Sequence, residues 1–361
     1  MAGIYVHIPF CKKRCLYCDF FSTTLLERRE EYVEALLKEI EQRKNEAGEP
    51  IYTVYLGGGT PSTLPAEQIA RILSTIGTDH AQEITMELNP GDATPEYLRA
   101  IRAAGINRLS IGIQSFKDNL LSLIGRRHDA REALNAVRMA QKAGFDNISI
   151  DLIYALPTQT MNDWKEDIET ALSLNIQHIS TYGLMYEEGT EMTRRLNAGE
   201  LEPVDEDTEN AMYDTLCARL QQAGFVHYEV SNFALPGYEA KHNSSYWDHT
   251  PYIGTGAGAH SYLPPVRSWN PSDLDAYIRG IQEGTLVRES ETLTDQDLYN
   301  ERIMLGLRTR QGINESLLSH SRSIVESLTG SELLAKTPNG RIIATQKGLH
   351  VLNRIIEQLM I

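Results

Sequence analysis

The chain has little of several features that define large classes of protein. Only four of its 361 residues are cysteine, and no apolar run approaches the roughly 20 residues that a membrane-spanning helix needs. Lysine and arginine together number 34 against 49 aspartates and glutamates, which gives a formal net charge of −15. Because nucleic-acid affinity rests on neutralising phosphates with basic side chains, this balance argues against a nucleic-acid partner. We expect a cytoplasmic protein, and the composition is also compatible with a peripheral contact with a membrane.

Three of the four cysteines, Cys11, Cys15 and Cys18, lie within eight residues of one another in YVHIPFCKKRCLYCDFF. An odd group of cysteines in a chain with no expected secretory segment does not predict a disulfide framework. Three thiolates leave a cubane iron–sulfur cluster one protein ligand short of the usual four, so one iron is open for chemistry. Zinc stays an alternative, with His7 as a fourth ligand. The remaining Cys217 lies at helical spacing from apolar residues and is predicted to be a packed apolar side chain.

Up to about residue 185, short β-rich runs alternate with amphipathic helical segments. The predicted strands are residues 4–8, 52–56, 83–88, 108–113, 147–153 and 178–183. Helices are predicted near residues 32–40, 66–76, 95–104, 130–143 and 161–174. Six successive β–α units imply a parallel sheet with helical crossovers, either an open sheet or a barrel. The strand pattern alone does not separate these two architectures.

Unusual polar and glycine-rich residues fall at the carboxyl ends of these strands, where barrels gather their chemistry. The glycines of LGGGTP (residues 56–61) let the backbone approach a ligand closely, although a tight strand–helix turn has the same composition. Glu87 and Asp151 lie in otherwise apolar strands, and a buried carboxylate is costly unless it is paired or binds a ligand. Gln114 and Arg126 add groups that suit a ribose hydroxyl and a carboxylate. These positions together predict one convergent site.

The ordered motifs resemble a known superfamily over nearly the whole chain. YVHIPFC-x₃-C-x₂-C, GGGTP, E-L-N-P, S-x-G-x-Q-S and D-L-I-Y-x-L-P are similar to those of the radical S-adenosylmethionine enzymes. Within that superfamily they resemble the branch of oxygen-independent coproporphyrinogen III oxidase and the haem chaperones related to it. The resemblance implies an α/β fold, a partial (β/α)₆ TIM-type barrel with a [4Fe–4S] cluster and S-adenosylmethionine at its open mouth.

The resemblance also implies which residues hold these cofactors. The cluster ligands would be Cys11, Cys15 and Cys18. The S-adenosylmethionine contacts would be Tyr5, the Tyr17 backbone, Gly58, Gly59, Thr60, Glu87, Gln114, Arg126 and Asp151. In this scheme the glycines and Glu87 hold the amino group, Arg126 holds the carboxylate, and the ribose binds the other two polar side chains.

Two local patterns favour the chaperone over the oxidase. The oxidase is expected to carry another cysteine two residues after the third, but here Asp19 and Phe20 follow Cys18. The chaperones are expected to carry H-N-x-x-Y-W, which this chain supplies in HNSSYW (residues 242–247).

The chemistry of HNSSYW suits haem. A neutral imidazole of His242 could ligate the iron, and Asn243 could hydrogen-bond a propionate or a ligand. Tyr246 and Trp247 offer flat apolar surface to the macrocycle. The alternatives are that the aromatic residues are core and the histidine caps a turn, or that His249 or His260 supplies the axial ligand.

Three segments are expected: the radical S-adenosylmethionine barrel over residues 1–225, an extension carrying the haem candidates over 226–290, and a helical, winged-helix-like domain over 291–361. The last segment holds equal numbers of acidic and basic residues, which favours packing or docking over DNA binding.

The resemblance implies a chaperone that binds haem and passes it to an apo-haemoprotein, such as a respiratory enzyme at the membrane. An electron donor such as a flavodoxin or ferredoxin would serve the cluster. The alternatives are the oxidative decarboxylation of coproporphyrinogen III and a structural metal-binding protein, so the sequence leaves catalytic turnover open.

Overall fold

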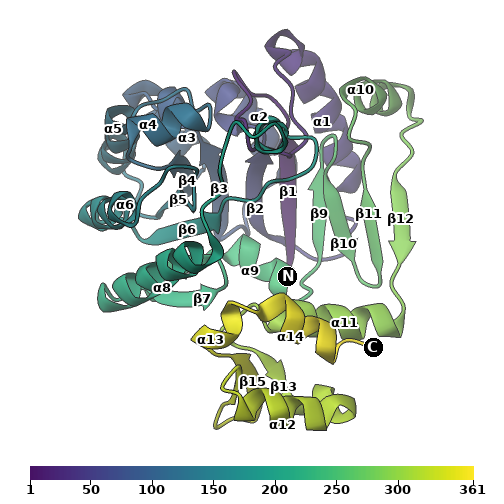
Figure 1. Cartoon of the computed structure of the whole chain (residues 1–361). Coiled ribbons are helices and arrows are strands. Elements are labelled where there is room, and N and C mark those ends of the chain that lie inside the picture. Colours follow the sequence, from purple (N-terminus) through teal and green to yellow (C-terminus); the bar gives the residue numbers. More distant parts are fainter.

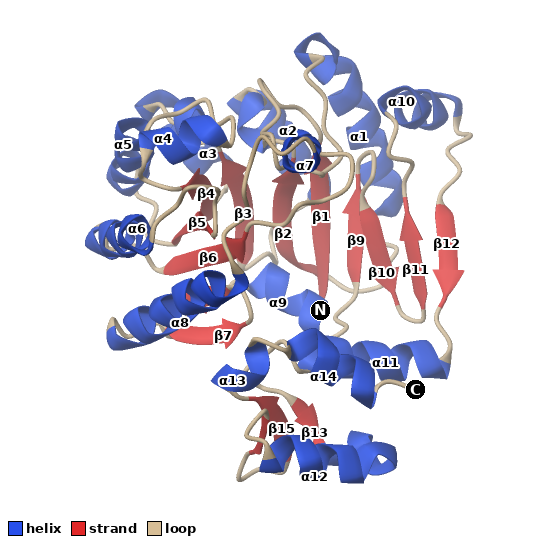
Figure 2. Cartoon of the chain, viewed as in Figure 1, coloured by secondary structure: helices blue, strands red, loops and turns tan.

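One twelve-stranded sheet organises most of the chain in this computed structural model, which describes residues 1–361 (Figures 1 and 2). Its middle holds six neighbouring strands in chain order, each parallel to the next. They are β1 (Ala2–Ile8), β2 (Ile51–Gly58), β3 (Glu83–Leu88), β4 (Arg108–Gln114), β5 (Ile148–Tyr154) and β6 (His178–Gly183). The sheet stays open, with β12 and β7 at its edges. The predicted α/β fold with six parallel strands is confirmed.

Apolar and polar residues alternate along these strands, and this alternation gives the sheet two chemically different faces. In β1, the apolar Ile4, Val6 and Ile8 are fully buried in the main core. Between them, Tyr5 and His7 point to the opposite face. The same alternation in the next strands puts threonine, tyrosine, glutamate, serine and aspartate on that second face. The helices therefore pack on the apolar side, and the polar side is left to build a site.

Helices follow the parallel strands as crossovers and bury their apolar stripes against the sheet. They are α1 (Arg29–Arg43), α2 (Ala66–Ile76), α3 (Pro95–Ala104), α4 (Asp118–Leu123), α5 (Ala130–Lys142) and α6 (Met161–Ser173). Short 3₁₀ turns occupy Leu26–Arg28, Pro61–Thr63, Pro90–Asp92 and Glu315–Ser321. Capping boxes at Asp129 and Thr160 begin α5 and α6, and Gly105 ends α3 in the left-handed conformation. These local signals explain why the predicted helices agree closely with the observed ones.

The segment after residue 225 extends the sheet at both edges. β8 (Asn232–Ala234) adds antiparallel to β6, and β7 (Val226–Glu229) pairs with β8. β9 (Tyr252–Thr255) adds parallel to β1, followed by three antiparallel strands. These are β10 (His260–Leu263), β11 (Val266–Trp269) and β12 (Glu289–Thr292), while α7 (Glu191–Asn197), α8 (Glu206–Gln222) and α10 (Leu274–Glu283) lie alongside.

The C-terminal segment has a small sheet and a core of 12 buried residues of its own. It contains α11 (Asp295–Gly306), β13 (Ile313–Asn314), α12 (Arg322–Gly330), β14 (Leu334–Lys336), β15 (Arg341–Ala344), α13 (Gln346–Leu349) and α14 (Leu352–Leu359). Figure 1 shows it below the large sheet, with α9 (Lys241–Trp247) between the two. None of the helices combines the length and apolar composition needed to cross a bilayer.

Candidate functional site

A cavity of about 410 Å³ opens at the carboxyl ends of the parallel strands. It is lined by the cysteine loop after β1, the glycine turn after β2 and polar residues of β3, β4 and β5. Every residue predicted to hold the cluster or S-adenosylmethionine lines it, except Tyr5. The Tyr5 ring instead stacks on Tyr55, at 6.1 Å between ring centroids. Residues as far apart in the sequence as Cys11 and Asp151 thus lie at one site.

The cysteine loop is held by its backbone rather than by its thiols. The Cys11 amide donates to the Thr23 carbonyl at 2.8 Å, and the Leu16 amide donates to the Ile124 carbonyl at 3.0 Å. Burial raises the pKa of the Cys11 thiol and raises that of Cys18 to about 11. This backbone support leaves all three thiols directed at the cavity that they line.

The three thiols do not converge on one point, and no set of three or more His, Cys, Asp or Glu side chains is arranged around a single ion. A cubane cluster places its ligand sulfurs on separate irons, so it needs thiols spread around a pocket. His7, the fourth ligand in the zinc alternative, is engaged elsewhere. Its Nδ1 lies 3.1 Å from the Tyr5 hydroxyl, and its Nε2 lies 2.9 Å from the Phe21 carbonyl. The donor set therefore fits a three-thiolate cluster better than a four-ligand ion.

The glycine turn needs glycine because it packs directly against the cysteine-bearing segment. Gly58 has a φ of +113°, and a Cβ there would lie 2.6 Å from the His7 ring. A Cβ on Gly59 would lie 2.8 Å from the Pro9 carbonyl carbon. The turn is therefore tight, as its composition predicts, and its backbone also lines the cavity.

Glu87 and Asp151 are half-buried carboxyl groups that form no ion pair. Glu87 accepts hydrogen bonds from the Tyr55 hydroxyl at 2.9 Å and the Gly58 amide at 3.2 Å. Asp151 accepts one from the Ser110 hydroxyl at 3.0 Å. Burial, reinforced by the Asp151 charge, raises the pKa of Glu87 to about 8, and burial also raises that of Asp151. Internal ion pairing, the alternative explanation for these carboxylates, is absent from the structure, so a polar ligand accounts for them better.

Arg126 and Gln114 complete the polar wall. Arg126 Nη1 lies 3.3 Å from the Cys15 sulfur, Nη2 donates to the Gly112 carbonyl, and the buried Nε has no partner. Arg126 lines the cavity, and a guanidinium group there suits a ligand carboxylate. Gln114 has a φ of +73°, in the left-handed region that non-glycine residues rarely adopt. Such strain is concentrated at ligand sites, where the surrounding structure holds it.

The haem candidates of HNSSYW lie away from this cavity, on α9. His242 is fully buried, with Nδ1 2.9 Å from the Thr53 hydroxyl and Nε2 2.9 Å from the Tyr246 hydroxyl. Its ring also stacks on Tyr55, and burial lowers its pKa to about 3. Both ring nitrogens are thus occupied inside the sheet's polar face. This geometry disagrees with the prediction that His242 ligates haem iron.

Residues that the sequence did not single out also line the cavities. Tyr182, in β6, and Met185, just after it, line the 410 Å³ cavity, and both side chains are exposed. Arg302 and Arg310, from the C-terminal segment, line a second cavity beside α9. Nothing in their local sequence marks any of these residues, because they reach the cavities only through the tertiary fold.

Comparisons with known proteins agree with this geometry. The model of the Radical SAM superfamily matches residues 5–171. The Heme chaperone HemW of Lactococcus lactis subsp. lactis (strain IL1403) is 37% identical over 370 residues, covering 99% of this chain and 97% of that protein. The Heme chaperone HemW of Bacillus subtilis (strain 168) is 36% identical over 323 residues, covering 87% and 85%.

A mitochondrial relative from Danio rerio, Radical S-adenosyl methionine domain-containing protein 1, is 34% identical, covering 96% of this chain and 83% of that protein. Among solved structures, the coproporphyrinogen III oxidase HemN of Escherichia coli superposes with a TM-score of 0.85 at 24% identity. That superposition covers 99% of this chain and 90% of the oxidase. At this identity the likeness establishes the shared fold.

Proposed function

The chain belongs to the radical SAM superfamily and, within it, to the family of the haem chaperone HemW, and from this premise we propose that it binds haem and transfers it to an apo-haemoprotein. The observation that carries the proposal is the match, over nearly the full length, to proteins named haem chaperones. The rival function is the oxidase reaction, which rests on a shared fold. The chain also lacks the further cysteine expected of the oxidase, because Asp19 and Phe20 follow the third cysteine.

We propose that the 410 Å³ cavity holds a [4Fe–4S] cluster and S-adenosylmethionine, the cofactors that the superfamily implies. Cys11, Cys15 and Cys18 would supply the thiolates and leave one iron for the ligand. When bound, the reduced cluster and the sulfonium supply one-electron chemistry that no protein side chain provides. The protein contributes an enclosed, positioned site.

Each polar group of the cavity has a ligand group that it suits. Glu87 and the Gly58–Gly59 backbone would hold the amino group, since the carboxylate accepts and the turn exposes backbone close to the ligand. The Arg126 guanidinium group, which lines the cavity, would meet the carboxylate. Gln114 and Asp151 would hydrogen-bond the ribose hydroxyls. The charges and donors of the chain therefore match the ligand along its length.

The acceptor and the electron source are part of the same proposal. We place an apo-haemoprotein, such as a respiratory enzyme at the membrane, as the acceptor. A flavodoxin or ferredoxin would reduce the cluster. Both follow from the family alone.

The experiment is an anaerobic haem titration of the cluster-reconstituted protein, followed by a coproporphyrinogen III turnover assay on the same sample. The proposal expects one haem per chain and no decarboxylated product. Turnover to protoporphyrinogen without stable haem binding would make the chain an oxidase. A Phe20→Cys variant provides a matched control, because it restores the missing cysteine without touching HNSSYW.

A further inference from the structure

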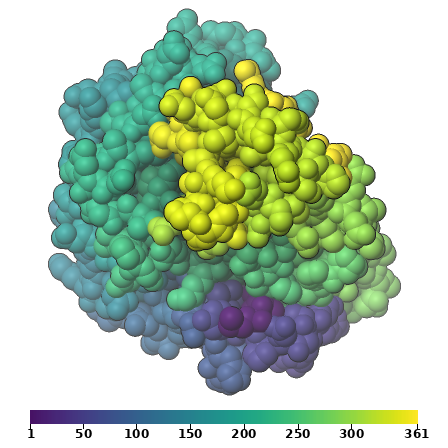
Figure 3. All heavy atoms as spheres, turned by 90° about the horizontal axis from the view of Figure 1, so that it is seen from below, coloured from purple at the N-terminus to yellow at the C-terminus, as the bar shows by residue number.

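A second cavity, of about 940 Å³, is lined in part by α9, the helix that carries HNSSYW. Its walls come from β7, α9, α11, β15 and the loop of residues 307–312. Figure 3 views the molecule from below, where the C-terminal segment (yellow-green to yellow) lies against the rest of the chain. The cavity is more than twice as large as the cofactor cavity, and its volume suits a large planar ligand.

The two faces of the helix α9 place different residues of the HNSSYW motif against the large sheet and against the large cavity. Residues three or four positions apart share one face of a helix. His242 and Tyr246 accordingly point together toward the large sheet, with 2.9 Å between His242 Nε2 and the Tyr246 hydroxyl. Ser244 and Trp247 line the large cavity instead. The aromatic surface that the sequence offers to a macrocycle is therefore Trp247, while the motif histidine serves to anchor the helix.

His249 lines the large cavity directly after α9 and has a strained backbone. Its φ is +62°, a conformation that glycine usually takes after a helix. A non-glycine residue held in this region is typical of functional sites. Its Nε2 lies 3.3 Å from Glu301 Oε2. A proton on Nε2 leaves the Nδ1 lone pair available, and a carboxylate behind a histidine is the usual arrangement for a metal ligand.

Two cationic side chains on the cavity wall have no partner. Arg302 and Arg310 line the cavity, and neither side chain makes a hydrogen bond or an ion pair. The third arginine of the lining, Arg341, donates to the Gln311 and Gly312 carbonyls at 2.6 and 2.7 Å.

The acidic groups of the lining, in contrast, are satisfied locally. Glu229 accepts from the Asn232 side chain, and Asp248 accepts from the Thr250 hydroxyl at 2.6 Å. Glu239 accepts from the Gly237 amide at 3.0 Å. The cavity therefore offers two uncommitted guanidinium groups, and guanidinium groups bind carboxylates in a bidentate manner.

We propose that this large cavity is the haem site. His249 Nδ1 reaches the iron, Trp247 packs on the macrocycle, and Arg302 and Arg310 bind the two propionates. The assignment rests on the proposed function, because it takes haem as the ligand. The axial ligand is then His249, at the wall of an open cavity, and not His242, because both ring nitrogens of His242 are hydrogen-bonded.

The test is a haem titration of reconstituted wild type, His249→Ala, Arg302→Ala and Arg310→Ala, followed through the Soret band. We expect His249→Ala to shift the Soret maximum, and each arginine variant to weaken haem binding about tenfold without moving the band. The arginines are exposed, so their loss leaves the fold intact even where His249→Ala does not. The cluster absorbance of each variant confirms that the barrel is folded.

Two further histidine variants serve as matched controls. His260 is exposed, stacked on Trp269 and outside the cavity, so His260→Ala should leave both band and affinity unchanged. Unaltered binding by the His249 and arginine variants, together with loss of the band in His242→Ala, would overturn the cavity assignment and leave the chaperone function standing. Absence of haem binding by the wild type would instead overturn the proposed function itself.

Discussion

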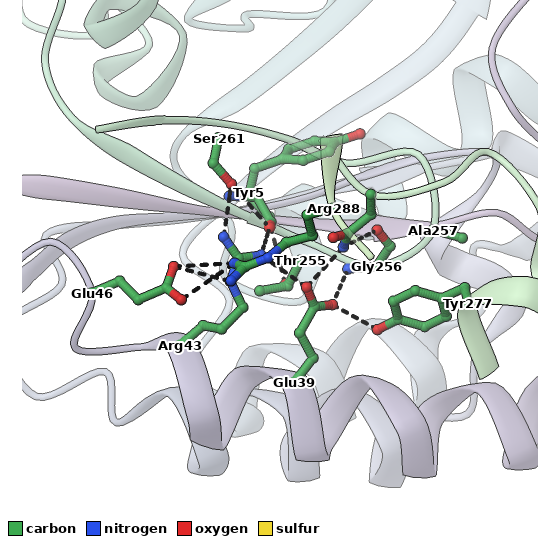
Figure 4. A network of polar contacts seen from close by, with 12 residues as sticks. Tyr5, Glu39, Arg43, Glu46, Thr255, Gly256, Ala257, Ser261, Tyr277 and Arg288 are labelled. Atoms are coloured by element: carbon green, nitrogen blue, oxygen red, sulfur yellow. Dashed lines mark hydrogen bonds and ion pairs between the residues drawn. The ribbon is translucent and has the colours of Figure 1, made fainter. Parts of the chain in front are cut away.

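The buried network around Glu39 should dominate the stability of the packing between α1, α10 and the β9 segment (Figure 4). Glu39 lies on α1 and is fully buried. Its carboxylate accepts from Arg43 at 2.8 Å, the Gly256 amide at 2.8 Å and the Tyr277 hydroxyl at 2.7 Å. Arg43 in turn donates to the Gly254 carbonyl at 2.6 Å. One carboxylate therefore ties α1, α10 and the glycine turn after β9 together.

Glu39→Ala removes the acceptor and leaves the buried Arg43 without this partner. Breaking a buried pair in this way costs about 3–5 kcal/mol. At roughly 2.1 cal/mol/K per residue, a chain of 361 residues has an unfolding entropy of about 0.76 kcal/mol/K. The expected fall in melting temperature is therefore about 5 °C.

Thermal unfolding of Glu39→Ala, Arg43→Ala and the double variant measures the coupling directly. Because either single change already breaks the pair, the double variant should cost clearly less than the two single costs added. Glu41→Ala is the matched control on the same helix, since the Glu41 side chain is exposed and its ion pair with Lys44 should contribute under about 1 kcal/mol. Additive single costs, or a control as damaging as Glu39→Ala, would refute the reasoning.

Three further predictions concern the cofactor cavity. Cys15→Ser should abolish the brown cluster absorbance after reconstitution, and a fully loaded variant would contradict the ligand assignment. Gly58→Ala should weaken S-adenosylmethionine binding and destabilise the fold because its Cβ meets the His7 ring, whereas Gly144→Ala, with a φ of +90° and open space around it, should leave binding unchanged. The folded-state pKa of Glu87, about 8, lies above its unfolded value of about 4.3. Between these values the folded chain binds more protons, so its stability falls as pH rises. Between about pH 5 and pH 8, the melting temperature of Glu87→Gln should therefore rise relative to that of the wild type as the pH increases. A pH-independent difference would contradict the cause given for the shift.

The parallel sheet and the cavity at its carboxyl edge could be predicted from sequence because each local signal agrees with the global fold. Alternating residues such as Ile4, Tyr5 and Val6 set the two faces of a strand, and parallel strands bring their carboxyl ends to one edge. Glu87 and Asp151 were conspicuous because a carboxylate is rare in an apolar strand. Glu87, Gln114 and Asp151, which strand direction alone places at one edge of the sheet, accordingly line one cavity.

The second cavity could not be predicted in the same way. Helical spacing shows that His242 and Tyr246 share a face of α9, but not which face turns inward. That choice depends on Thr53 and Glu83 of distant strands, since Thr53 meets the His242 ring and Glu83 accepts from the His242 amide at 2.9 Å. Arg302 comes to the same wall as His249 only because the C-terminal segment docks beside α9.

The most direct measurement of the central claim is haem transfer from the loaded protein to an apo-haemoprotein of the b type, followed after the two are mixed and separated by an affinity tag. The account predicts that each chain loses one equivalent of haem. The acceptor should gain this haem and show the Soret band of the haem-loaded acceptor. Haem that stays bound to the chain in the presence of excess acceptor would contradict the account.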